Sequence, residues 1–203
     1  VPIRPGTDGA LLLALVHEIM ALGLYDREFL ARYTNAGQLV NQDSASDDFG
    51  LMLRNAGGDI VNPLRPANFY WWDRHTQAPV ADHAEGTDPA LLGKYQMPDG
   101  TPAVPAFQLL EERVKPYTAD WASGITGIPA DTIRRLAREM GITARDQKIE
   151  LPIAWTDSWG KRHESVTGNP VAFHAMRGLA AHSNGFHTIR TLAILMSLLG
   201  TID

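Results

Sequence analysis

The sequence predicts an α/β protein in which a small, largely parallel sheet is flanked by helices and carries an irregular insertion. Apolar residues recur at helical spacing near both ends of the chain, in residues 8–22 and 188–199. Two short apolar runs, 149–153 and 171–176, have the composition of strands. Residues 35–105 hold most of the prolines and many glycines and show weak periodicity, which indicates an irregular segment.

Composition indicates a packed protein and excludes several functions. The chain has 203 residues, of which 44% are apolar and 20% are charged, as in ordinary globular proteins. Its formal net charge is −5 and no run of Lys or Arg stands out, which argues against a general nucleic-acid binder. The absence of cysteine excludes disulfides, Fe–S ligands and a cysteine nucleophile within this chain. No apolar run reaches the roughly 18 residues that a membrane span needs.

The predicted elements divide the chain into two parts. We expect residues 1–34 and 106–203 to form an α/β body, and 35–105 to form a Pro/Gly-rich insertion packed on it. Turn and cap residues set the predicted ends of the helices. The expected helices are 8–22 before Gly23, 26–33, 106–114, 119–125 capped by Thr118, the helix after Pro129 that ends at Gly141, and the last one before Gly200. Residues 69–73 form an aromatic strand candidate, and 97–100 a turn.

The opening turn, Arg4-Pro5-Gly6-Thr7-Asp8, is the motif with the clearest chemistry. Pro5 and Gly6 predict a tight bend, and Thr7 is a favourable N-cap for the helix that follows. The free N–H groups at such a helix start suit a phosphate, and the Asp8 carboxylate can accept the two adjacent N–H donors of a guanine. A capped helix after a Pro-Gly turn is also common without a ligand, so the turn alone leaves both interpretations open.

A second polar cluster lies in residues 174–185, after a strand candidate and before the last helix. In open α/β sheets ligands bind at the carboxyl ends of strands, which is the position predicted for this loop. Gly178 and Gly185 allow close approach of the backbone to a ligand. Donors suited to a phosphate or a ring carbonyl come from Arg177, His182, Ser183 and Asn184. The alternative is that Asn184 only caps the last helix and that the histidines bond to the local backbone.

The histidines raise the question of a metal site. Four of them lie close together in the sequence, at His163, His174, His182 and His187. None belongs to an H-E-x-x-H pattern, and no carboxylate stands at a useful spacing. Walker, G-x-S-x-G and G-x-G-x-x-G motifs are also absent from the sequence. We therefore expect no metal bound by this chain, and a histidine-metal hydrolase is the weakest of the alternatives.

Three segments, in this order, resemble the molybdopterin oxidoreductases of the dimethyl-sulfoxide-reductase and formate-dehydrogenase superfamily. The first comprises residues 1–11 with the opening turn, followed by a helix and by matches at 23–30 and 33–40. The second is Ile-Thr-Gly-Ile-Pro-Ala at 125–130, and the third runs from Gly178 to the end of the chain. The resemblance covers both ends of the chain and little of the middle.

The resemblance implies a cofactor, molybdopterin guanine dinucleotide with molybdenum, held in part by the α/β body. In that family the Asp of the opening turn binds the guanine, and the loop of the third segment contacts the pterin. The implied cofactor contacts are Gly6, Thr7, Asp8, Arg177, Gly178, His182 and Asn184. The family's metal ligand lies in a part that has no counterpart here. We therefore expect no catalytic residue in this chain, no turnover by the chain alone and no cofactor retained by it.

The chain begins at Val1 without Met and ends at Asp203 just after an apolar helix, so we expect it to be cut from a larger enzyme. Its partners would be the remaining domains of that enzyme and, as a further option, an electron-transfer subunit. The compartment, bacterial cytoplasm or periplasm, stays open. So does the substrate: formate, a sulfur oxyanion or an arsenic oxyanion. The competing interpretation is a non-catalytic nucleotide-binding or scaffold module.

Overall fold

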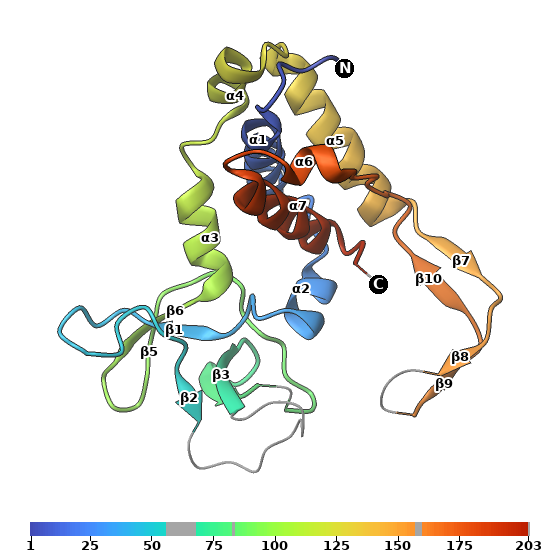
Figure 1. The fold of residues 1–203 in the computed structure, drawn as a ribbon. Helices are drawn as coiled ribbons and strands as arrows, with labels where there is room; N and C mark the ends of the chain where they lie inside the picture. Colours follow the sequence, from blue (N-terminus) through green and yellow to red (C-terminus); the bar gives the residue numbers. More distant parts are fainter. Residues whose placement is uncertain (56–67, 83, 157–159, 203) are drawn as a thin grey trace. The chain divides into compact units, whose positions relative to one another are not determined.

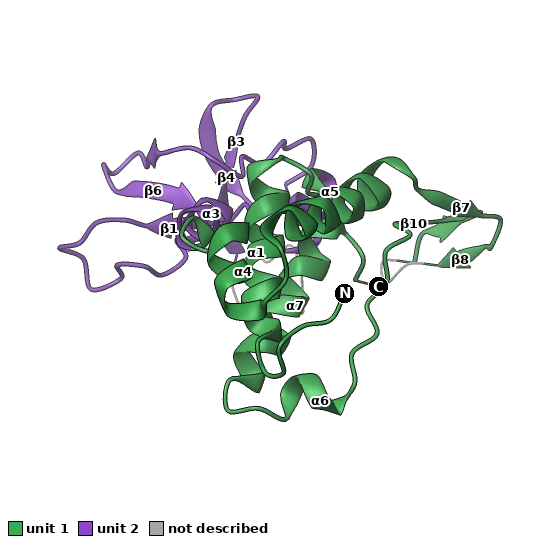
Figure 2. Ribbon diagram, turned by 90° about the horizontal axis from the view of Figure 1, so that it is seen from above, with its two compact units in different colours: residues 1–27, 114–203 green, residues 28–113 purple. Residues whose placement is uncertain are grey.

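The computed structural model describes residues 1–55, 68–82, 84–156 and 160–202, which form two compact units. Unit 1 comprises residues 1–27 and 114–203, and unit 2 comprises residues 28–113 (Figures 1 and 2). Part of the predicted insertion, residues 56–67, lies outside the described residues. That residues 1–34 and 106–203 bind a cofactor while 35–105 form an insertion remains a prediction.

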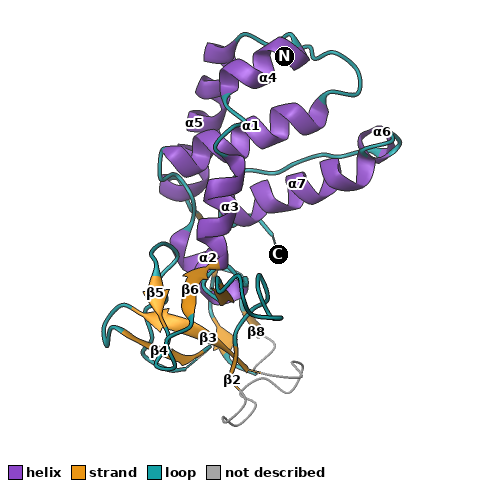
Figure 3. Ribbon diagram, turned by 90° about the vertical axis from the view of Figure 1, so that its left-hand side faces the viewer, coloured by secondary structure: helices purple, strands orange, loops and turns teal. Residues whose placement is uncertain are grey.

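Unit 1 is built around helix α1 (Asp8–Ala21). Three helices pack against it: α4 (Ala119–Thr126), α5 (Ala130–Asp146) and α7 (Gly185–Leu199). The short helix α6 (Arg177–Ala180) precedes α7. Figure 3 shows α1 between α5 and α7. Side chains from several faces of α1 are fully buried, among them Ala14, Val16 and Ile19, so this helix is covered on more than one side.

Several helix ends form where turn and cap residues predict them. Gly23 has a φ of +63° directly after α1, and the backbone N–H of Leu24 donates to the carbonyl of Ile19 at 2.9 Å. The hydroxyl of Thr118 accepts a hydrogen bond from the N–H of Trp121 at 3.2 Å and so caps α4. Gly200 ends α7 in the left-handed conformation. These stops and caps are confirmed.

Two predicted helix boundaries are wrong. Helix α5 does not end at Gly141 but continues to Asp146. A Cβ atom built on Gly141 would lie 2.6 Å from the Cβ of Leu24, so this glycine serves a close helix contact and not a helix stop. Helix α7 begins at Gly185, three residues before the predicted start, because Gly185, Phe186 and His187 also adopt helical conformation after the N-cap position of Asn184.

The strands of unit 1 are antiparallel, which corrects the prediction of a largely parallel sheet. β7 (Ile149–Leu151) pairs with β10 (Val166–Gly168), and β8 (Trp155–Thr156) pairs with β9 (Arg162–His163). The expected strand at 171–176 has no regular secondary structure. A parallel sheet would need a crossover between its strands, whereas here β7 and β10 frame the nested β8–β9 pair. The strand predicted at 149–153 is confirmed up to Leu151, where Pro152 ends it.

The described residues of unit 2 form two three-stranded antiparallel sheets. One has the order β1 (Leu39–Asn41), β6 (Pro102–Pro105), β5 (Tyr95–Gln96), and the other β2 (Arg54–Asn55), β3 (Asn68–Asp73), β4 (Ala78–Ala81). Helices α2 (Arg27–Tyr33) and α3 (Ala106–Val114) each lie in unit 2 except for one terminal residue. The aromatic strand and the helix 106–114 are thus confirmed. The fold is mixed α/β with small antiparallel sheets.

Buried carboxylates hold the second sheet of unit 2 together. Asp73 accepts hydrogen bonds from the N–H of Asp88 at 3.0 Å and from both the N–H and the hydroxyl of Thr76. Burial alone would raise the pKa of Asp73, but these hydrogen bonds outweigh it and hold the pKa well below its usual range. Asp82, also buried, accepts from the side-chain amide of Gln38 at 2.9 Å. Hydrogen bonds to buried carboxylates therefore help to stabilise this part of unit 2, where the apolar periodicity of the sequence is weak.

In the described ranges, no helix is both long enough and apolar enough to cross a membrane.

The contact at Gly141 makes a stability prediction. Replacing Gly141 with Ala places a methyl group 2.6 Å from the Leu24 Cβ, and we expect this overpacking to lower the free energy of unfolding by about 1–3 kcal/mol. Gly124→Ala is the matched control, because nothing lies within 4 Å of its Cβ position in α4. It should raise stability by about 0.5–1 kcal/mol through helix propensity. Urea unfolding measures both, and equal effects would contradict the close contact.

Candidate functional site

The opening turn forms as the sequence predicts. The N–H of Thr7 donates to the carbonyl of Arg4 at 3.3 Å, which closes a turn with Pro5 and Gly6 at its centre. Gly6 has a φ of +78°, the left-handed value that the third position of a type II turn requires. Helix α1 then begins at Asp8. The chain therefore bends sharply immediately before a helix N-terminus.

The predicted side-chain cap by Thr7 is wrong. Thr7 occupies the N-cap position, but its hydroxyl donates to the carbonyl of Arg4 at 2.7 Å and accepts nothing from α1. Within the described residues, the N–H groups of Asp8 and Gly9 find no acceptor, as expected at an uncapped helix start. The Asp8 carboxylate is half-buried and has no hydrogen bond or ion pair with those residues. Donors and an acceptor are thus available together at this end of α1.

The loop before α7 is folded by its own backbone. The N–H of Gly185 donates to the carbonyl of His182 at 2.9 Å, and Asn184 occupies the N-cap position of α7 without a side-chain cap. A Cβ atom on Gly185 would lie 1.9 Å from the carbonyl oxygen of Ala180. Gly185 therefore permits a close contact within the chain, where the sequence suggested an approach to a ligand. Phe186 and His187 have N–H groups without an acceptor among the described residues.

The structure brings the opening turn and this loop together. A Cβ atom built on Gly6 would lie 3.8 Å from Nδ1 and Cε1 of the His182 ring. A Cβ atom built on Gly9 would lie 3.7 Å from the side-chain amide nitrogen of Asn184 and 3.0 Å from the hydroxyl oxygen of Thr188. The N-termini of α1 and α7 consequently lie side by side, and each contributes the positive end of its helix dipole. Residues from opposite ends of the sequence share one site.

Two predicted residues stand apart from this contact. Gly178 has nothing within 4 Å of its Cβ position. The guanidinium of Arg177 is exposed and makes no hydrogen bond or ion pair with the described residues. Both lie in α6. The structure therefore joins Gly6 to His182 but gives no contact that ties Arg177 or Gly178 to the turn.

Sequence reasoning missed the partners of Arg4. Its guanidinium Nη1 donates to the carbonyls of Gly124 and Ile125 at 3.1 and 3.2 Å, and its backbone N–H donates to the carbonyl of Thr126 at 3.0 Å. These carbonyls form the C-terminus of α4, which Gly127 closes with a φ of +77°. An arginine before a Pro-Gly turn gives no sequence signal of where its side chain bonds. The first two family motifs thus meet at Arg4.

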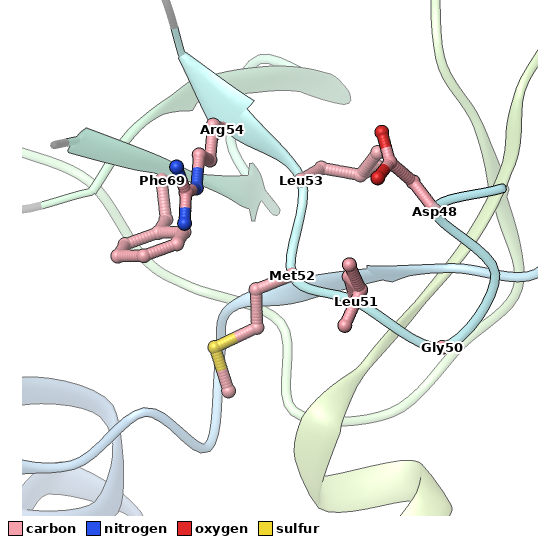
Figure 4. Close-up of a pocket in the computed structure, with 7 residues that line it drawn as sticks. All are labelled: Asp48, Gly50, Leu51, Met52, Leu53, Arg54 and Phe69. Atoms are coloured by element: carbon pink, nitrogen blue, oxygen red, sulfur yellow. The ribbon is translucent and has the colours of Figure 1, made fainter.

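Other features of the described residues involve different side chains. No group of three or more His, Cys, Asp or Glu side chains among them is arranged to hold a metal ion. In unit 2 a hollow of about 700 Å³ is lined by Asp48, Gly50, Leu51, Met52, Leu53, Arg54 and Phe69. Figure 4 shows Arg54 beside the Phe69 ring, with Asp48 on another side of the hollow. None of the predicted site residues lines it.

The order of the three motifs resembles that of the molybdopterin oxidoreductases, and comparison with known proteins shows that the chain belongs to this family. It is 64% identical over its whole length to a sulfite dehydrogenase subunit of Allochromatium vinosum. It is 33% identical over 72% of its length to the alpha subunit of the perchlorate reductase of Dechloromonas aromatica. It is 27% identical over its whole length to a dimethyl sulfoxide reductase of Escherichia coli.

The chain spans only part of each relative: 21% of the sulfite dehydrogenase subunit, 19% of the perchlorate reductase subunit, 16% of the dimethyl sulfoxide reductase. No family model matches the chain. The relatives are large oxidoreductase subunits, and the chain corresponds to one segment of them.

The turn geometry predicts different costs for two glycines. Gly6→Ala puts a side chain on a residue with positive φ, and we expect a loss of about 1–2 kcal/mol in the free energy of unfolding. The added methyl itself fits, since its nearest neighbour is 3.8 Å away. Gly178→Ala, in open space, should change stability by less than about 0.5 kcal/mol. Chemical denaturation compares the two, and a Gly6 variant as stable as the Gly178 variant would contradict the turn.

Proposed function

We propose that this chain forms part of the binding site for the guanine-nucleotide end of molybdopterin guanine dinucleotide in a larger oxidoreductase. One observation carries the proposal: the opening turn and the loop before α7 are in contact, so two helix N-termini open side by side. Phosphates bind favourably at such ends, because free N–H groups and the helix dipole both attract negative charge. The membership of the molybdopterin oxidoreductases supports this choice of ligand.

The residues at the junction fit such a ligand. Asp8 and Gly9 offer N–H groups without an acceptor among the described residues, and Phe186 and His187 offer two more. The Asp8 carboxylate is the acceptor we assign to the paired N–H donors of guanine. A dinucleotide needs both donors and acceptors, and this junction supplies them within one part of unit 1.

We assign the remaining contacts from the hydrogen-bond donors and acceptors that each residue still has available. Gly6 would contact the nucleotide through its backbone. The hydroxyl hydrogen of Thr7 is already donated to Arg4, so Thr7 would act on the ligand only as an acceptor. His182 and Asn184, both exposed beside the turn, would donate to phosphate or to the pterin. For Arg177 and Gly178 we propose the same class of contact at the start of α6.

When bound, the molybdenum cofactor supplies the redox chemistry, and this chain's residues bind and orient one end of it. We assign no catalytic residue here. The proposed partners are the other parts of the same polypeptide, together with a second subunit that exchanges electrons with it. The relative from Allochromatium vinosum is itself named as a subunit, which supports the latter.

The assignment of Asp8 predicts a loss of cofactor. In the full-length protein that contains this chain, Asp8→Asn replaces one acceptor of the paired guanine donors by an amide donor. We expect the purified variant to carry at least about tenfold less guanine nucleotide, because mispairing one such group costs upward of about 1.4 kcal/mol. The measurement is guanine nucleotide and molybdenum per polypeptide after acid release.

Asp131→Asn is the matched control, because Asp131 also lies in the first turn of a helix, α5, far from the turn in sequence. It loses its ion pair with Arg134 and the same favourable dipole contact. Its cofactor content should equal that of the unchanged protein. Full nucleotide content in the Asp8 variant would sink the proposed function.

For the substrate of the larger protein, we propose sulfite. The support is the identity of 64% over the whole chain to a sulfite dehydrogenase subunit, compared with 33% for the perchlorate reductase subunit. Oxidation of sulfite with water gives sulfate, two protons and two electrons, and the electrons pass to an acceptor.

This substrate predicts sulfite-dependent reduction of an artificial acceptor such as ferricyanide by the full-length protein. Formate and dimethyl sulfide serve as alternative donors in the same assay. Turnover with formate and none with sulfite would contradict the proposed substrate, while leaving the assignment of Asp8 to be judged by cofactor content.

A further inference from the structure

The C-terminus of helix α4 depends on a single residue from the start of the chain. A helix leaves its last four carbonyls without partners in the helix itself. In α4 the carbonyl of Ser123 accepts from the N–H of Gly127 at 3.0 Å. Arg4 satisfies the other three, two through its guanidinium and one through its backbone N–H. A positive side chain at this end also suits the helix dipole.

Arg4 is hydrogen-bonded within the opening turn as well as to α4. Its carbonyl accepts both the N–H of Thr7, at 3.3 Å, and the hydroxyl of Thr7, at 2.7 Å. Pro5, the next residue, has a fixed φ, and Gly6 takes the left-handed value that completes the turn. Every polar group of the Arg4 backbone and part of its guanidinium are therefore used within the chain.

We propose that Arg4 is a positioning residue for the guanine nucleotide. It fixes the opening turn to the end of α4, so that Gly6 and Asp8 lie at the correct place beside His182. Arg4 acts through geometry and not through a contact with the ligand. The inference rests on the proposed function, since it concerns the same site.

The geometry of the guanidinium makes arginine the suitable residue here. One Nη1 atom donates to two neighbouring carbonyls, which requires two N–H bonds held in a plane at a fixed angle. A lysine ammonium carries the same charge but is a point donor on a flexible stem. If position matters, lysine at this site cannot replace arginine. If only charge matters, it can.

The test uses the full-length holoenzyme with Arg4→Gln and Arg4→Lys. We expect both variants to lose bound guanine nucleotide about tenfold faster after dilution, since changes in affinity act mainly on dissociation. Hydrogen exchange supplies a second measurement that needs no ligand. The hydrogen-bonded amides of Thr7 and Ala10 should exchange faster in both variants, because the turn is no longer held to α4.

Thr118→Ala is the matched control. It removes the side-chain cap at the opposite end of α4 and so weakens the same helix without touching Arg4. We expect it to lower the unfolding midpoint while leaving nucleotide release and exchange of the Thr7 and Ala10 amides unchanged. If Thr118→Ala speeds nucleotide release as much as Arg4→Gln, general stability of α4 is the cause and the inference is overturned.

The remaining outcomes separate the two proposals. A lysine variant that retains nucleotide like the unchanged protein would show that charge suffices, which overturns the positioning role. An Asp8→Asn variant with normal cofactor content would overturn the proposed function itself. Faster exchange of the Thr7 and Ala10 amides in the Arg4 variants, together with unchanged nucleotide release, would overturn the inference and leave the assignment of Asp8 standing.

Discussion

Burial of helix α1 is the constraint on which unit 1 depends. Its side chains at Ala14, Val16 and Ile19 are fully buried, and it is packed by α4, α5 and α7. Burying each large aliphatic side chain contributes about 1.5–3 kcal/mol, so these contacts fix the helices around α1. Once the helices are fixed, the positions of their ends follow. The site is made of those ends.

A site of this kind needs few specialised side chains. The free N–H groups of two helix N-termini come from the backbone, and they exist wherever a helix starts without a side-chain cap. Thr7 and Asn184 both stand at N-cap positions and neither caps its helix. The donors are thereby left for another partner. This arrangement suits binding and orientation of a ligand, and the chain matches one segment of much larger oxidoreductases.

Unit 2 is stabilised in a different way. Its short strands bury only a small apolar cluster around Leu39, Met97 and Ala103, and buried polar side chains also stabilise the unit. The carboxylate of Asp73 accepts a hydrogen bond from the backbone N–H of Asp88. The carboxylate of Asp82 accepts from the backbone N–H of Phe69 in β3 and from the side-chain amide of Gln38. Carboxylates with such partners are stable in their charged form. Sequence periodicity is weak in this region because polar interactions, such as the Gln38–Asp82 bond across 44 residues, help to organise it.

The sequence by itself determined the local structures. The helices, the left-handed glycines at Gly23 and Gly200, the cap at Thr118 and the bend at Gly6 follow from propensity and turn chemistry within a few residues. The order of three motifs also sufficed to indicate the molybdopterin oxidoreductases, which the comparisons confirm.

Only the tertiary structure decided the long-range pairings. Strands 149–151 and 166–168 pair antiparallel, and 171–176 forms no strand, because pairing depends on which edges the fold brings together. Gly141 looked like a helix stop, yet it accommodates Leu24 from the other end of unit 1, and Gly185, which looked like a ligand contact, accommodates the backbone of Ala180. The contact of Gly6 with His182 and the bonds of Arg4 to α4 join residues whose separation along the chain leaves no local signal. Packing around α1 created them.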